Sequence, residues 1–166
     1  MHKVLIKQVF GGTSDNTLSQ IRKAFTIDFD QKYLADEITD FPYEEILKQI
    51  RKDTAINADF IEELLNTQKD SKYSFSILSL IYPYLDYKNN NFHKDHLHPE
   101  SKFSDLSDSD KTKYSWGQYN SICNLQMLDA NENMSKNGKS LNEWVEKEVK
   151  TKDRTTFLEN HLIPDV

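Results

Sequence analysis

The chain has 166 residues, 37% of them hydrophobic and 11% aromatic, which is enough for one ordinary domain or two small ones with an apolar core. Its single cysteine excludes a disulfide within the chain and the cysteine-rich zinc sites, and no apolar run approaches the roughly 18 residues that span a membrane, so we expect a soluble, cytoplasmic protein without a membrane partner. The formal net charge of −6 argues against broad electrostatic binding of nucleic acid, so any surface that binds phosphate must be local.

Residues 1–88 predict a helical module. Residues 11–15 lack the Gly-Lys-Ser/Thr ending of a phosphate-binding loop, so we expect a turn and a helix cap there. Asp40 is expected to cap one helix, and a cap near Asn57 predicts another amphipathic helix. Residues 73–85 carry apolar side chains on every face, which predicts a central, buried helix.

Residues 89–166 predict a second module, which follows a polar stretch that suits a boundary. We expect one strand at 92–97, ended by Pro99, and a second strand at 122–128. The residues between the two strands predict a surface excursion with one short helix after Ser107 or Ser109.

Two helices are expected after the second strand. Asp129 and Glu132 form a capping-box pattern, and the pair at 137–138, Asn-Gly, is typical of a left-handed helix end. Ser140 and Glu143 predict a second capping box, which opens a further amphipathic helix. The sequence therefore predicts an α+β fold in which a strand, a loop, a strand and a short helix follow one another.

The pattern that says most about function lies on these elements. The run Asp95-His96-Leu97-His98-Pro99 stands at the end of the first strand, and Asn124, Asn133 and Lys136 follow on the second strand and the short helix. If the two strands pair and the helix packs across them, Asn133 and Lys136 point the same way, because they are three positions apart. We expect these side chains to converge beside Asp95 and His96.

This set of residues has the chemistry that phosphodiester hydrolysis needs. The Asp95 carboxylate and the Asn133 amide oxygen are hard ligands of the kind that Mg²⁺ accepts, and Mg²⁺ often keeps several waters beside one or two protein ligands. An imidazole with an ordinary pKa of about 6.5 is suited to take a proton from water, which predicts His96 as the general base. Strand alternation turns the His96 ring away from Asp95, so a shared site requires a distorted strand end.

These motifs resemble the HNH, or ββα-metal, nucleases. Residues 95–99 are similar to the Asp/Glu-His-hydrophobic-x-Pro segment of that family, and residues 124–136 are similar to its asparagine-bearing strand and helix. The closest likeness is to the C-terminal nuclease region of GmrSD-like type IV restriction proteins; it covers residues 92–145 and is only loose over the first half. Such proteins carry an N-terminal nucleotide-dependent domain, so we expect this chain to be a fragment that works with that missing domain.

The resemblance implies a helical N-terminal half followed by a ββα-metal motif with flanking helices. It implies a DNA endonuclease or nickase that acts in restriction and phage defence. The roles that it implies are His96 as general base, Asp95 and Asn133 as ligands of Mg²⁺ or Mn²⁺, Asn124 as the residue that orients the base or braces the loop, and Lys136 as a phosphate contact. Asn133 stands where the family often has a histidine, and the zinc-binding cysteine pairs of some HNH enzymes are missing.

Two other functions fit the same residues. One is a non-catalytic nucleic-acid-binding or adaptor module that keeps the fold, and the other is an RNase with the same chemistry. Salt-sensitive DNA binding without metal binding favours the adaptor, and selective cutting of RNA favours the RNase. The sequence does not predict the target sequence, the base modification or the oligomeric state.

Several of these residues also have structural interpretations. His93 and His98 fit a polar loop, and a zinc site built from the neighbouring histidines lacks a fourth ligand. Asn124 and Asn133, taken alone, are as typical of turns and caps as of a site. The basic run that continues after residue 136 is interleaved with acidic residues, so a solvated helix face fits it as well as a DNA-binding surface.

Overall fold

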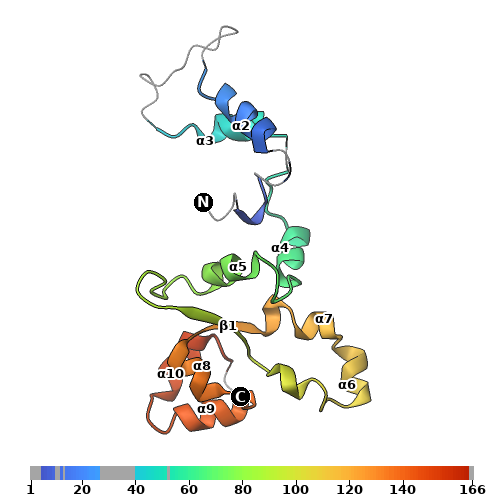
Figure 1. Ribbon diagram of the computed structural model, residues 1–166, viewed down its shortest axis with the longest axis vertical. Coiled ribbons are helices and arrows are strands. Elements are labelled where there is room, and N and C mark those ends of the chain that lie inside the picture. Colours follow the sequence, from blue (N-terminus) through green and yellow to red (C-terminus); the bar gives the residue numbers. More distant parts are fainter. Residues whose placement is uncertain (1–4, 10–11, 13, 27–39, 52, 165–166) are drawn as a thin grey trace. The chain divides into compact units, whose positions relative to one another are not determined.

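The computed structural model describes residues 5–9, 12, 14–26, 40–51 and 53–164. The chain divides into two compact units, residues 1–56 and 57–166, and each is described by itself (Figure 1). The predicted α+β class is confirmed, because helices and a two-stranded antiparallel sheet are both present in the described residues. The functional boundary expected at residues 88 and 89 stays a prediction.

The first unit contains helices α2 (Ser14–Lys23) and α3 (Tyr43–Gln49). The backbone N–H of Arg51 donates to Gln20 Oε1 at 3.2 Å and ties the end of α3 to α2. The prediction of Asp40 as a helix cap was wrong: α3 begins after Pro42, and no side chain caps its first turn. The loop expected at residues 11–15 lies partly outside the described residues.

The second unit begins with helices α4 (Ala58–Leu65) and α5 (Ser74–Ile81). Asn57 caps α4 as predicted, since its side chain accepts a hydrogen bond from the Phe60 backbone N–H at 2.9 Å. Helix α5 is buried only on the face that packs against the sheet, which carries Ile77 and Leu78. The prediction of a central, buried helix over residues 73–85 was wrong in its length and its burial, because α5 ends at Ile81 and the apolar residues on its other faces stay exposed: Phe75, Leu80 and Ile81.

The sheet consists of β1 (Phe92–His96) and β2 (Leu125–Asp129), paired antiparallel. Both strands were predicted, but β2 begins three residues late because Ile122–Asn124 forms a 3-10 turn, η2. In the register of the sheet, Asp95 lies opposite Gln126 and His96 lies opposite Leu125. Opposed residues share a face and successive residues alternate, so Asp95 and Gln126 occupy one face and His96 the other.

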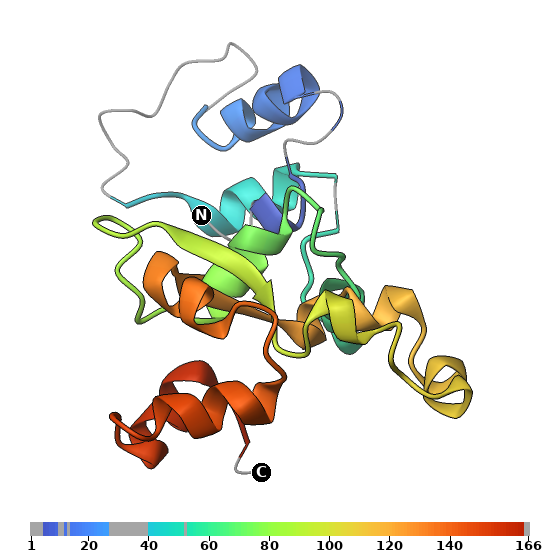
Figure 2. The ribbon, with the colours of Figure 1, turned by 60° about the horizontal axis from the view of Figure 1, so that its bottom comes forward.

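The excursion between the strands contains η1 (Glu100–Lys102), α6 (Asp108–Lys113) and α7 (Trp116–Tyr119). The short helix expected after Ser107 is α6, and Ser107 caps it by accepting from the Asp110 N–H. Helix α7 was not predicted, because four residues are too few to show a periodic pattern. Both Figure 1 and Figure 2 show α6 and α7 reaching away from the sheet.

Three helices follow β2: α8 (Ala130–Lys136), α9 (Leu141–Glu148) and α10 (Arg154–His161). Asp129 caps α8, and Asn137 and Gly138 end it with positive φ angles of 37° and 71°, as the sequence predicts. The capping box of α9 is also confirmed, with hydrogen bonds in both directions between Ser140 and Glu143. Helix α10 was not predicted. In the described part of the chain, no helix is long and apolar enough to cross a membrane.

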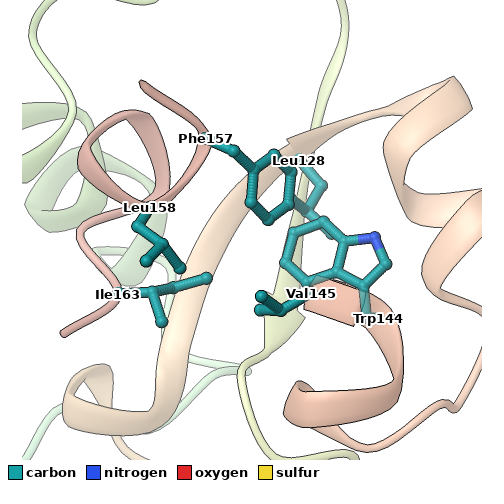
Figure 3. Close-up of a cluster of buried hydrophobic side chains, with 6 residues drawn as sticks. All are labelled: Leu128, Trp144, Val145, Phe157, Leu158 and Ile163. Carbon is teal, nitrogen blue, oxygen red and sulfur yellow. The ribbon is translucent and has the colours of Figure 1, made fainter. Parts of the chain in front are cut away.

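An apolar core joins β2 to α9 and α10 (Figure 3). The rings of Trp144 and Phe157 meet edge to face, with their centroids 5.1 Å apart, and Leu128 packs beside them. The other members of this core are Val145, Leu158 and Ile163. Leu128 shares a face of β2 with Gln126, so the C-terminal helices pack on the face of the sheet that carries Asp95. Helix α8 contacts both strands.

Candidate functional site

A buried lysine joins α8 to the end of β1. Lys136 is 1% exposed, and its Nζ donates to Asp95 Oδ2 at 2.7 Å and to the carbonyl oxygen of His96 at 2.5 Å. Burying an unpaired ammonium group is costly, so the position of the helix and the position of the Asp95 carboxylate depend on each other. Lys136 is therefore directed into the protein, toward the strand, and not toward solvent.

Asn133 lies on α8, the helix whose Lys136 contacts Asp95. Asn133 lies three positions before Lys136 on α8. Residues three positions apart are neighbours on the surface of a helix, so both side chains project from one helix face. Its side chain is half-buried and forms no hydrogen bond within the described part of the chain. Asp95 is 25% exposed in its side chain, and Lys136 uses only its Oδ2. Asp95 Oδ1 is thus the carboxylate oxygen that Lys136 leaves unused.

Gln126 is a third polar side chain on this face, and sequence reasoning missed it. It lies directly across the sheet from Asp95 and is fully buried. Neither Oε1 nor Nε2 of Gln126 has a hydrogen-bond partner among the described residues. The signal in the sequence is a glutamine inside an otherwise apolar strand, between Leu125 and Met127.

The His96 ring lies on the opposite face of the sheet, is buried, and has a contact at each nitrogen. Its Nε2 is 2.9 Å from Asn120 Oδ1, and its Nδ1 is 3.4 Å from Lys69 Nζ. A lysine ammonium can only donate, so Nδ1 accepts, and Nε2 carries the proton that is donated to Asn120. Burial lowers the pKa of His96 below its ordinary value, which favours this neutral form.

The structure therefore does not bring the His96 ring and the Asp95 carboxylate to one face. The ring packs beside Trp116 and Tyr119, with centroid separations of 6.5 and 6.4 Å. Its hydrogen-bond partners, Asn120 and Lys69, were also missed by sequence reasoning. No local pattern points to them, because they lie 24 and 27 positions from His96 and are placed by α7 and by the loop after α4.

Asn124 braces the loop that follows β1. Its Oδ1 accepts from the His98 backbone N–H at 2.9 Å, and its Nδ2 donates to the carbonyl oxygens of His98 at 3.1 Å and Tyr119 at 2.8 Å. These three hydrogen bonds go to backbone atoms and none to the His96 ring. Of the two roles expected for Asn124, this geometry corresponds to bracing the loop.

The two flanking histidines are both exposed. His93 lies within β1 and not in a loop, whereas His98 follows the strand and lines a groove of about 570 Å³ together with Asn124 and Tyr119. Although His98 is exposed, the protein atoms around its ring displace enough water to lower its pKa, and the charge of Lys136 acts in the same direction. The imidazole that lines this groove therefore binds a proton less readily than an ordinary histidine.

Two residues of the basic run after residue 136 are paired with acids. Lys152 lies 2.9 Å from Glu148 and 3.8 Å from Glu132, and Arg154 lies 3.4 Å from Glu146. Such pairs are typical of a solvated helix face, which leaves less free positive charge for phosphate than the sequence alone suggests.

The side-chain oxygens of Asp95 and Asn133 are of the hard type that Mg²⁺ accepts, and Mg²⁺ completes its shell with water. Among the described residues, no group of three or more histidine, cysteine, aspartate or glutamate side chains is placed to hold a metal ion. No family model matches the chain, and no curated protein matches it significantly.

Proposed function

We propose that this chain is a metal-dependent nuclease module that hydrolyses phosphodiester bonds in DNA, as part of a protein that restricts foreign DNA. The observation that carries the proposal is the contact between β1 and α8, in which Lys136 holds Asp95 and the same helix face presents Asn133. The likeness of residues 92–145 to the HNH nucleases supplies the reaction class and the role in restriction.

In this proposal the polar residues divide into a cation side and a base side. Asp95 and Asn133 would hold Mg²⁺ or Mn²⁺, which supplies positive charge to the phosphate and to the leaving oxygen. Lys136 keeps the Asp95 carboxylate in place and compensates part of its charge. The two oxygen ligands thereby hold a fixed position relative to the strand end.

On the base side, the tautomer of His96 leaves Nδ1 as the atom that accepts a proton. The Nε2–H donates to Asn120, which fixes the plane of the ring and stabilises the proton on that side. Lys69 occupies the Nδ1 side, so a water that gives its proton to His96 must replace the Lys69 contact. Asn124 holds the next part of the loop at the backbone of His98.

A specific observation also supports the second candidate, a non-catalytic nucleic-acid-binding or adaptor module. Lys136 already gives the Asp95 carboxylate a buried cation, and both nitrogens of His96 have contacts. These contacts form without a metal ion and would stabilise the strand–strand–helix unit by themselves. In that case the unit binds nucleic acid without cutting it.

Measuring the cutting and the binding of nucleic acid on the same protein preparations distinguishes the nuclease from the adaptor. Supercoiled plasmid and a structured RNA are each incubated with the chain in Mg²⁺, in Mn²⁺ and in chelator. The nuclease proposal predicts metal-dependent nicking of the plasmid that His96→Ala removes, while His93→Ala, an exposed histidine on the same strand, leaves it unchanged.

Retained, salt-sensitive DNA binding without cutting in either metal would favour the adaptor instead. Cutting of the RNA alone would favour an RNase.

A further inference from the structure

A groove lies beside the loop that follows β1. Its volume is about 570 Å³, which is in the range of pockets that hold one small ligand. Its walls come from the end of α4, from the loop after β1, from the excursion that holds α6 and α7, and from η2. Asn124 ties two of these walls together, because its amide donates to the carbonyl oxygens of His98 and Tyr119. Hydrogen bonds within the second unit therefore fix the shape of the groove.

The lining of the groove carries no formal charge. Among the described residues that surround it there is no aspartate, glutamate, lysine or arginine, although these four types make up 29% of the chain. The polar groups that it offers to a ligand include the imidazole of His98 and the amide of Asn66. A charged ligand would lose its hydration there without gaining a partner, so the lining suits a neutral ligand that has hydrogen-bonding groups.

Aromatic rings supply the apolar part of the lining. The Tyr119 ring is stacked on Trp116, with centroids 6.1 Å apart and an interplanar angle of 21°, and Phe103 packs against both rings. Tyr114 lines the groove from the end of α6 and is 44% exposed. An exposed ring of this kind offers a face on which a flat heterocycle stacks.

One cation stands beside this ring. Lys113 is exposed, and its Nζ lies 4.9 Å from the centroid of the Tyr114 ring. A heterocycle in the groove and a phosphate at Lys113 together make up one nucleotide. In a DNA duplex the faces of the bases are covered by their stacked neighbours, so only an unpaired base presents its face to a tyrosine.

We propose that this groove binds an unpaired nucleobase of the DNA strand that the proposed nuclease cuts. This inference rests on the proposed function and deepens it, because it names single-stranded or locally opened DNA as the substrate class. His98 lies two residues after His96, so a strand whose base occupies the groove has its backbone near the end of β1.

The first test measures DNA binding by the full chain in chelator, where the result does not depend on cutting or on a metal ion. Fluorescence anisotropy compares a labelled single-stranded oligonucleotide of deoxythymidine with the same strand in a duplex. We expect the parent to bind the single strand more tightly than the duplex. Tyr114→Ala should lose about tenfold in affinity for the single strand, because the ring on which the base stacks is removed.

Two matched variants control for this substitution. Tyr114→Phe keeps the ring and should bind the single strand as the parent does. Tyr84→Ala removes a tyrosine that is 53% exposed and lies in the same unit but outside the groove, and it should also bind as the parent does.

The second test needs no substitution, because Cys123 is the single cysteine of the chain, is exposed and lines the groove. Its reaction with a thiol reagent is timed with the oligonucleotide, with the duplex, with deoxythymidine monophosphate and with a uridine oligoribonucleotide. At ten times its dissociation constant, the DNA single strand leaves only about one chain in eleven free, so the reaction should slow about tenfold. The duplex and the mononucleotide at the same concentration should leave the rate nearly unchanged.

Several outcomes would overturn the inference while the nuclease proposal stands. One is an unprotected Cys123 at a saturating concentration of the single strand, and another is an unchanged affinity in folded Tyr114→Ala. Equal protection by the duplex would exclude the need for an unpaired base, and equal protection by the mononucleotide would assign the groove to a free nucleotide.

Two further outcomes reach the proposed function itself. Tighter binding and stronger protection by the oligoribonucleotide would assign the groove to RNA and favour the RNase. If the parent binds neither the single strand nor the duplex, both this inference and the proposed action on DNA fail.

Discussion

The Asp95 carboxylate and the His96 imidazole project from adjacent positions of β1 onto opposite faces of the sheet. Asp95 meets Lys136 of α8, whereas His96 meets Asn120 and Lys69. A substrate that contacts both side chains must therefore lie at the end of the strand and not over either face. The loop that follows this end is the one that Asn124 braces, so its rigidity matters for the proposed reaction.

The ion pair between Lys136 and Asp95 should contribute strongly to stability. Lys136→Met leaves the carboxylate and the His96 carbonyl oxygen without their donor, and we expect a loss of about 3 kcal/mol in the free energy of unfolding. Urea denaturation followed by tryptophan fluorescence measures it. Both tryptophans, Trp116 and Trp144, lie in the second unit and report its unfolding.

The matched control for this variant is Lys102→Met, which removes an exposed ion pair with Asp105 at 3.5 Å. Its effect should stay within about 0.5 kcal/mol, because pairs of solvent-exposed charges contribute little. Equal effects of the two substitutions would contradict the importance given to the buried pair.

Asn124 should control how tightly the loop after β1 is held. Asn124→Ala removes three hydrogen bonds to the backbone, including the one from the His98 N–H. We expect the hydrogen exchange of the His98 amide to accelerate and the free energy of unfolding to fall by about 2–3 kcal/mol. Asn124→Asp keeps the acceptor for His98 but loses both donors, so its His98 amide should stay more protected than in the alanine variant. An unchanged His98 exchange rate in Asn124→Ala would show that the brace is ineffective.

Burial of His96 predicts a stability that depends on pH. The pKa of His96 is lowered in the folded state, so the unfolded state binds a proton more readily. The resulting stabilisation is fully present above the unfolded pKa of about 6.5 and is lost as the pH falls below it toward the folded pKa. We therefore expect the unfolding temperature to decrease between about pH 7.5 and about pH 5.5.

His96→Gln should flatten this dependence, and His93→Gln, at an exposed histidine, should preserve it. The same account predicts that imidazole ¹⁵N shifts at pH 7.5 place the proton of His96 on Nε2. A proton on Nδ1, or a pH dependence that is identical in His96→Gln and the parent, would count against the arrangement of His96, Asn120 and Lys69.

Local signals predicted the elements that local interactions form. Asn57, Ser107, Asp129 and Ser140 cap helices where the sequence indicates, because a cap depends on a side chain and on backbone groups two or three residues away. The Asn-Gly end of α8 was predictable for the same reason. The cap expected at Asp40 failed because the helix begins three positions later, after Pro42.

The contacts within the candidate site depend on parts of the chain that are distant in sequence. Pairing of Lys136 with Asp95 joins residues 41 positions apart, and the partners of His96 come from α7 and from the loop after α4. The sequence placed Asp95, Asn133 and Lys136 on adjoining elements, because strand and helix periodicities are local. It did not predict which partners the His96 ring has, nor that Gln126 is buried opposite Asp95.

The central claim, that β1 and α8 together form a metal-dependent nuclease site, is tested most directly by the nicking of supercoiled plasmid in Mg²⁺ or Mn²⁺ by Asn133→Ala and Asn131→Ala. Both asparagines lie on α8. Asn131 is exposed and lies two positions before Asn133, so it is not on the helix face that Asn133 shares with Lys136. The account predicts that the parent and Asn131→Ala nick the plasmid, that chelator stops both, and that folded Asn133→Ala is inactive. Nicking that is equal in Asn133→Ala and the parent, or that persists in chelator, would contradict it.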